Sequence, residues 1–79
     1  MPRFYFHLFN DINVADNEGQ NFGDLAEARD FAIEQARALI AATAVDEGRI
    51  VLHHRIDIED ERHELLESLH FRDAVTVEA

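Results

Sequence analysis

The sequence predicts an α+β domain of order β-β-α-β-β, with an antiparallel sheet and one long helix packed on one face. Two observations predict it. In the middle of the chain, apolar residues recur over a long stretch with the spacing of a helix. On both sides of this stretch, apolar and polar residues alternate, and polar turns interrupt the alternation. Short hairpins on either side of one helix are most economically arranged as a sheet covered on one face. The 79 residues form a single predicted domain, residues 1–79.

The first hairpin is predicted from residues 3–9, which alternate in aromatic and apolar residues typical of strands. Asn10-Asp11 forms a turn, and residues 12–16 return as a second strand. Residues 17–19 form another turn that ends in a glycine able to adopt a positive φ. Residues 20–23 connect this turn to the helix, with one or two of them extended.

The register of this hairpin has two solutions. A two-residue loop would place Phe6 opposite Ala15, whereas a three-residue loop places Leu8 opposite Val14. We prefer the second register, because it groups Val14 with the apolar side of the first strand, which carries Phe4, Phe6 and Leu8.

The helix is predicted over residues 24–46. Asp24 is placed to cap its first turn, and Glu27 to reach back to the cap, while Gly48 is suited to the left-handed residue that ends a helix. The centre of its apolar face is a line of small residues, Ala28, Ala32 and Ala36. This line lets the helix approach the sheet closely, with the large side chains supplied by the strands. Because the helix is longer than the strands, we expect residues 41–46 to overhang the sheet.

The second hairpin is predicted from strands over residues 50–58 and 63–71, joined by a turn centred on Asp60-Glu61. The facing pairs would be Ile58/His63, Ile56/Leu65, His54/Glu67, Leu52/Leu69 and Ile50/Phe71. One face would then be apolar around a single His–Glu pair. Residues 72–79 are expected to form a tail or a short extra strand.

Composition excludes several classes of function. Seven arginines, no lysine and seventeen acidic residues give a formal charge of −10, which would repel a phosphate backbone, so we predict no nucleic-acid binding. No apolar run reaches membrane-spanning length and no signal peptide is evident, so we predict no membrane association and a cytoplasmic location. With no cysteine, stability depends on apolar packing within one chain or shared with a second copy.

Three segments carry a resemblance to a known family. They are the start Met1-Pro2-Arg3-Phe4-Tyr5-Phe6-His7-Leu8, the turn Asp16-Asn17-Glu18-Gly19, and the closing Phe71-Arg72-Asp73-Ala74, which lie around an alanine-rich helix. With these the chain resembles a family of short alphaproteobacterial proteins of unknown function. The sequence departs from that family at Asp60-Glu61-Arg62, where members often have a glycine-containing turn. The resemblance implies a bacterial cytoplasmic protein and transfers no catalytic or binding residue.

A second likeness concerns the start of the helix alone. Asp24-Leu25 and Glu27-Ala28 are similar to the segment that opens the main helix of HicB-type antitoxin domains. That resemblance would imply a regulatory protein that binds a basic toxin partner.

The candidate functional residues are mainly histidines. Residues of the outer sheet face are predicted to form a partly aromatic, partly titratable interaction surface: Tyr5, His7, Phe9, His53, Arg55 and His70. Because an uncovered aromatic face usually needs a partner, we consider homodimerisation through this face or an edge strand. His54 and Glu67 are interpreted as a structural hydrogen bond rather than a zinc or acid–base site. His53 and His54, as neighbours on a strand, would point to opposite faces and not bind one ion together.

Three function classes remain at this stage. The preferred one is a non-enzymatic protein–protein interaction or assembly module, a homodimer or the binder of a protein partner. The second is an antitoxin-like regulator of a basic partner, and the third a small histidine/carboxylate enzyme or metal-binding protein. For the preferred class we predict no catalytic residue, cofactor or metal ion. The enzyme would require His54 and Glu67, or the outer-face histidines, to line one concave pocket.

Overall fold

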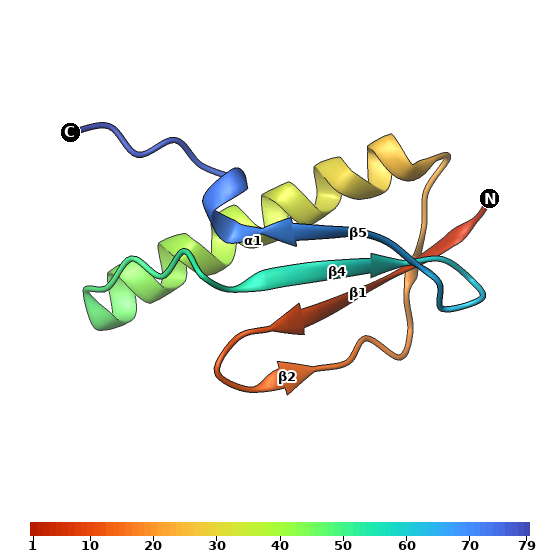
Figure 1. The fold of residues 1–79 in the computed structure, drawn as a ribbon, viewed down its shortest axis with the longest axis horizontal. Coiled ribbons are helices and arrows are strands. Elements are labelled where there is room, and N and C mark those ends of the chain that lie inside the picture. Colours follow the sequence, from red (N-terminus) through yellow and green to blue (C-terminus); the bar gives the residue numbers. More distant parts are fainter.

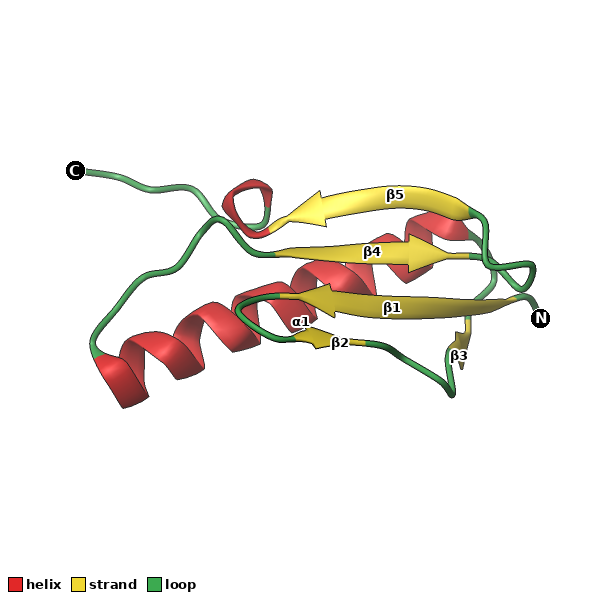
Figure 2. Cartoon of the chain, turned by 60° about the horizontal axis from the view of Figure 1, so that its bottom comes forward, coloured by secondary structure: helices red, strands yellow, loops and turns green.

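A single long helix lies across one face of a five-stranded antiparallel sheet in the computed structural model, which describes residues 1–79 (Figure 1). The elements are β1 (Arg3–Phe9), β2 (Asn13–Val14), β3 (Gln20–Asn21), α1 (Leu25–Glu47), β4 (Arg55–Glu59), β5 (Leu65–His70) and the 3₁₀ turn η1 (Phe71–Asp73). The strand order is β2-β1-β4-β5, and β3 pairs with the opposite end of the β1 edge that β2 occupies (Figure 2). The predicted α+β class is therefore confirmed. No helix combines the length and apolarity needed to cross a membrane.

Both ends of α1 are fixed by the residues the sequence singled out. The carboxylate of Asp24 accepts the backbone N–H of Glu27 at 3.0 Å, while the Glu27 carboxylate accepts the N–H of Gly23, one residue before the cap. Gly48 has a φ of 66° and donates its N–H to Ala44, which closes the last turn. The C-terminal end of α1 extends past the strands, as expected (Figure 1).

The core lies between the alanine line and the sheet. Ala28, Ala32 and Ala36 have no exposed surface, so the helix backbone approaches the strands closely. The strands supply the large buried side chains, Phe4, Ile56, Ile58 and Leu69. Beside them four phenylalanine rings, those of Phe4, Phe6, Phe22 and Phe31, form a chain of contacts with centroids 5.0–6.4 Å apart.

The first hairpin has the preferred register. Leu8 pairs with Val14 and Phe9 with Asn13, so the loop has three residues. The predicted strand 12–16 is shortened to the two residues of β2, because the chain turns away at Asp16. It returns to β1 as β3, where Phe4 pairs with Gln20.

The predicted register of the second hairpin is wrong. Ile56 pairs with Leu69 rather than Leu65, and Ile58 pairs with Glu67 rather than His63, with a bulge after Ile58. The tip is a loop of residues 60–64 rather than a tight turn.

That loop is organised by one side chain. The Asp60 carboxylate accepts the N–H groups of Arg62 and Glu64, and His63 adopts a left-handed φ of 62°. The five-residue connection shifts the pairing of β4 and β5 along the chain.

The segment before β4 is not a strand, which corrects the predicted strand 50–58. Residues 49–54 carry the chain from the overhanging end of α1 back to the sheet, so the alternation there does not place side chains on a sheet face. Val51 is buried, whereas Ile50 is 62% exposed.

The C-terminal segment also differs from the predicted strand alternative. Phe71 and Ala74 are buried against the core, and Arg37 of α1 donates to the carbonyl of Ala74 at 2.7 Å. Residues 74–79 form no strand, and the first of them hold η1 against α1.

Candidate functional site

The uncovered face of the sheet holds five of the six predicted interaction residues. Tyr5, His7 and Phe9 of β1 lie opposite Glu59, Asp57 and Arg55 of β4, and Arg55 lies opposite His70 of β5. These positions alternate with the buried residues that face α1, so their side chains share the opposite face. His53 is the exception, because it lies in the segment before β4.

The charges on this face are paired with one another. Asp57 accepts hydrogen bonds from Arg55 at 3.1 Å and from the Ser68 hydroxyl at 2.7 Å. The Arg55 guanidinium lies 4.1 Å from the centre of the Phe9 ring, a cation–π distance. The charged groups of Arg55 and Asp57 on this face are therefore engaged within one chain.

A histidine–glutamate–histidine cluster occupies one end of the same face. Glu59 Oε1 lies 2.9 Å from His7 Nε2 and 3.3 Å from His63 Nδ1, and the His63 ring packs on Tyr5. His7 Nδ1 accepts the backbone N–H of Asp16 at 3.0 Å. Because that nitrogen accepts, the other must carry the proton and donate it to Glu59. His7 Nε2 is therefore not free to ligate a metal ion.

Asp16 closes the free edge of β1 between β2 and β3. Its Oδ1 accepts the N–H groups of Glu18 and Gly19, and its Oδ2 accepts the N–H of Phe6, all at 3.0–3.1 Å. Partial burial raises the pKa of Asp16, but these three hydrogen bonds outweigh burial and lower it.

Gly19 is required at the end of this turn. It has a φ of 70°, and a Cβ there would lie 2.8 Å from the carbonyl oxygen of Phe4. The turn Asp16-Asn17-Glu18-Gly19 is predicted from the sequence, whereas the role of Asp16 in sealing a strand edge is not. An aspartate placed two and three residues before backbone N–H groups is the local signal for it.

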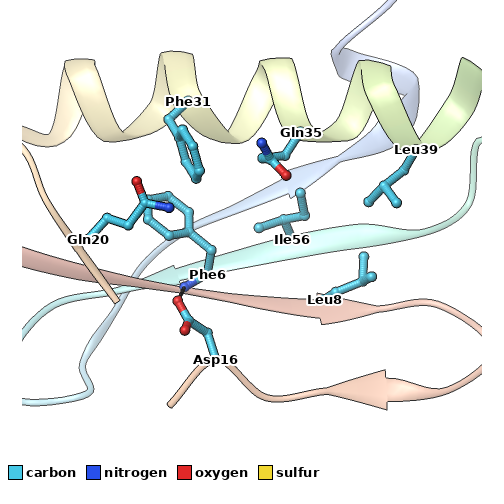
Figure 3. A pocket seen from close by; sticks show the side chains of 8 residues that line it. All are labelled: Phe6, Leu8, Asp16, Gln20, Phe31, Gln35, Leu39 and Ile56. Atoms are coloured by element: carbon cyan, nitrogen blue, oxygen red, sulfur yellow. Dashed lines mark hydrogen bonds between the residues drawn. The ribbon is translucent and has the colours of Figure 1, made fainter. Parts of the chain in front are cut away.

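An apolar cleft of about 350 Å³ opens beside this turn, between α1 and the sheet (Figure 3). Its lining residues are Phe6, Leu8, Asp16, Gln20, Phe31, Gln35, Leu39 and Ile56. The polar groups at its mouth are two amides and the Asp16 carboxylate, which already accepts three backbone N–H groups. The cleft therefore presents apolar surface without a free charged group.

His54 lines a smaller cleft near the C-terminal end of α1, which corrects its predicted pairing with Glu67. Glu67 instead binds Arg29 of α1 at 2.7 Å. The His54 ring packs edge-on against Phe71, and its Nε2 is buried without a hydrogen-bond partner, 3.7 Å from the carboxylate of Asp11.

The relation of His54 to His53 is also corrected. Their ring centroids lie 4.6 Å apart, because this segment is not a strand, so the two side chains do not point to opposite faces. Asp11, His53 and His54 offer ligand atoms within 4.8 Å of one another. No spacing in the sequence links Asp11 to the two histidines, since the contact depends on the fold.

The structure does not assemble the pocket that the enzyme hypothesis required. His54 lines its cleft without Glu67, and none of the three clefts is lined by the predicted outer-face histidines His7, His53 and His70.

The edge of the sheet at β5 is the remaining exposed feature. β5 pairs with β4 on one side only (Figure 2). Leu65 and Leu66 at its start are 57% and 39% exposed. A strand with one unpaired edge and exposed leucines is a surface suited to pairing with another strand.

Comparison with known proteins places the chain in a family without a known role. A family model described as a domain of unknown function, DUF6894, matches residues 3–72. No curated protein and no solved structure matches the chain.

Proposed function

The chain belongs to the DUF6894 family, and we propose that this member is a non-enzymatic assembly domain that pairs with a second copy of itself along β5. The observation that carries the proposal is the contrast between the two sheet edges. At β1, the short strands β2 and β3 occupy the two ends of the edge, and the Asp16 carboxylate between them accepts the N–H of Phe6. At β5, no strand, side-chain cap or proline protects a six-residue strand.

A second copy fits this edge because the sheet is antiparallel throughout. Two β5 strands related by a twofold axis run antiparallel, so pairing them continues the sheet with its existing geometry. The exposed side chains of Leu65 and Leu66 would lie at this junction and lose contact with water. A strand of six residues is about 20 Å long, which corresponds to a modest interface and a concentration-dependent dimer.

The dependence on salt distinguishes self-association from binding to a basic partner. Each chain carries a formal charge of −10, so two copies repel one another and salt weakens the repulsion. Self-association should therefore strengthen as ionic strength rises. A complex with a basic partner, the antitoxin-like alternative, should weaken instead.

The test is solution mass by sedimentation equilibrium across protein concentration, at about 50 and about 500 mM salt. We expect a monomer–dimer equilibrium that shifts toward dimer at the higher salt. Leu66→Glu, which places a charge on the edge, should weaken the dimer by about ten-fold or more. Val45→Glu is the matched control, because Val45 is 84% exposed on α1 and the charge change is the same.

Two results would contradict the proposal. One is a monomer at every concentration and salt. The other is a dimer that Leu66→Glu weakens no more than Val45→Glu does, which would place the interface away from β5.

A further inference from the structure

Among the side-chain nitrogen and oxygen atoms, one is buried without a hydrogen-bond partner, Nε2 of His54. The side chain is 13% exposed and packs against the Phe71 ring with centroids 5.6 Å apart, so its position is fixed by the core. Buried polar atoms are nearly always satisfied, and an exception calls for a specific explanation such as a bound ion. Asp11 Oδ1 lies 3.7 Å from this nitrogen, and the centroid of the His53 ring lies 4.6 Å from that of the His54 ring.

The distances around this atom suit a metal ion better than a hydrogen bond. His54 Nε2 and Asp11 Oδ1 are 3.7 Å apart, too far for a hydrogen bond. Two ligands of a tetrahedral zinc ion, each bonded at about 2.0–2.1 Å, lie about 3.4 Å from one another. The three potential ligand atoms of Asp11, His53 and His54 lie within 4.8 Å of one another.

To bind one ion, the three ligand atoms must come closer together, and two of the three side chains are exposed enough to move. Asp11 is 78% exposed at the tip of the first hairpin, and His53 is exposed beside His54. Rotation of these two side chains brings their ligand atoms toward the fixed His54 without disturbing the core. From this geometry we infer that Asp11, His53 and His54 bind a divalent first-row transition metal ion, with zinc as the representative ion.

The residue types define the class of metal. Two imidazoles and one carboxylate suit Zn²⁺, Cu²⁺ or Ni²⁺, whereas Ca²⁺ and Mg²⁺ prefer sites built from oxygen ligands. Three protein ligands leave the fourth position of a tetrahedral ion to water. Glu47 and Arg49 line the same cleft, and they pair with each other at 3.0 Å, so the Arg49 charge is partly neutralised.

A second cluster of potential metal ligands can be compared with this site. His7, Glu59 and His63 also lie close together. Their atoms are already engaged, since His7 Nδ1 accepts the N–H of Asp16 and His7 Nε2 donates to Glu59. Binding a metal there would require breaking these hydrogen bonds. His54 Nε2 has no hydrogen bond to break.

A metal ion at this site would join two segments distant in sequence. Asp11 belongs to the first hairpin tip, and His53-His54 to the segment that enters β4. Because the unfolded chain does not hold the three ligands together, ion binding stabilises the folded state. The site lies at the opposite end of β4 from the β5 residues Leu65 and Leu66, so it is independent of the proposed dimer.

The test uses the untagged, metal-free full chain titrated with Zn²⁺ in a calorimeter. We expect one ion per chain and a rise in melting temperature that a chelator reverses. Asp11→Asn and His53→Gln should each weaken zinc binding by about ten-fold or more. Both replace exposed side chains, so both variants should fold. His63→Gln is the matched control and should bind zinc like the parent chain.

Cobalt provides a second readout independent of stability. Co²⁺ in a tetrahedral site of this kind gives visible absorption that the hydrated ion lacks, and Asp11→Asn should reduce it.

Three outcomes would overturn the inference. They are no zinc binding by the parent chain, loss of binding in His63→Gln but not in His53→Gln, and one ion shared between two chains.

Discussion

Replacing Ile58 with alanine is expected to lower the free energy of unfolding by about 2–5 kcal/mol. The side chain has no exposed surface, and among the large side chains it and Leu69 alone are less than 2% exposed. Much of the rest of the core consists of alanines, which cannot expand to fill the space left by the removed carbons. Urea denaturation followed by circular dichroism measures the effect.

Two further variants serve as controls. They distinguish the loss of buried side-chain volume from a change in strand propensity, and they keep the effect measurable if Ile58→Ala does not fold. Small domains have few kcal/mol to lose, so Ile58→Ala alone can leave no folded state to measure. Ile58→Val removes one methylene-sized group and should cost about 0.5–1.5 kcal/mol. Ile50→Ala, at a side chain 62% exposed, should change stability by less than about 0.5 kcal/mol. Equal losses at Ile58 and Ile50 would contradict the assignment of the core.

The features that the sequence predicted correctly are those with local causes. The helix boundaries follow from Asp24, which caps its own first turn, and from Gly48, which alone at its end tolerates a left-handed φ without cost. The alanine line on the buried face follows from the helical period. The first hairpin follows from a loop so short that one register brings Val14 beside Leu8.

The second hairpin shows why pattern alone does not determine register. The observed partner of Ile56 lies four residues beyond the predicted one, Leu69 instead of Leu65. A slip by an even number of residues keeps every side chain on its own face, so the apolar alternation fits both registers equally well. The loop decides between them, through the Asp60 carboxylate and the left-handed His63.

The candidate sites depend on contacts that no local pattern encodes. The outer-face positions of Tyr5, His7 and Phe9 follow from strand alternation and were predicted. The contact of Asp11 with His54 depends on how far α1 overhangs the sheet and on the path of the chain that returns from it. For the same reason His53 was placed on a strand that does not exist there.

Replacing Asp16 with alanine is expected to destabilise the domain by about 2–3 kcal/mol at neutral pH. The carboxylate accepts three backbone N–H groups, those of Phe6, Glu18 and Gly19, and hydrogen bonds to a charged group are stronger than neutral ones. Its loss leaves the N–H of Phe6 unpaired at the half-buried edge of β1. The neighbouring Asn17→Ala, which removes an exposed side chain of the same turn, should cost less than about 0.5 kcal/mol.

The same residue predicts a dependence on pH. The pKa of Asp16 in the folded chain lies below its ordinary value of 3.8, so the carboxylate is more readily ionised when folded than when unfolded. Its contribution is therefore complete above about pH 5 and is lost as pH falls through the unfolded and then the folded pKa. Urea denaturation at a series of pH values should show the gap between the parent chain and Asp16→Ala narrowing in acid. A gap that stays constant down to pH about 2 would show that the turn is held by something other than the ionised carboxylate.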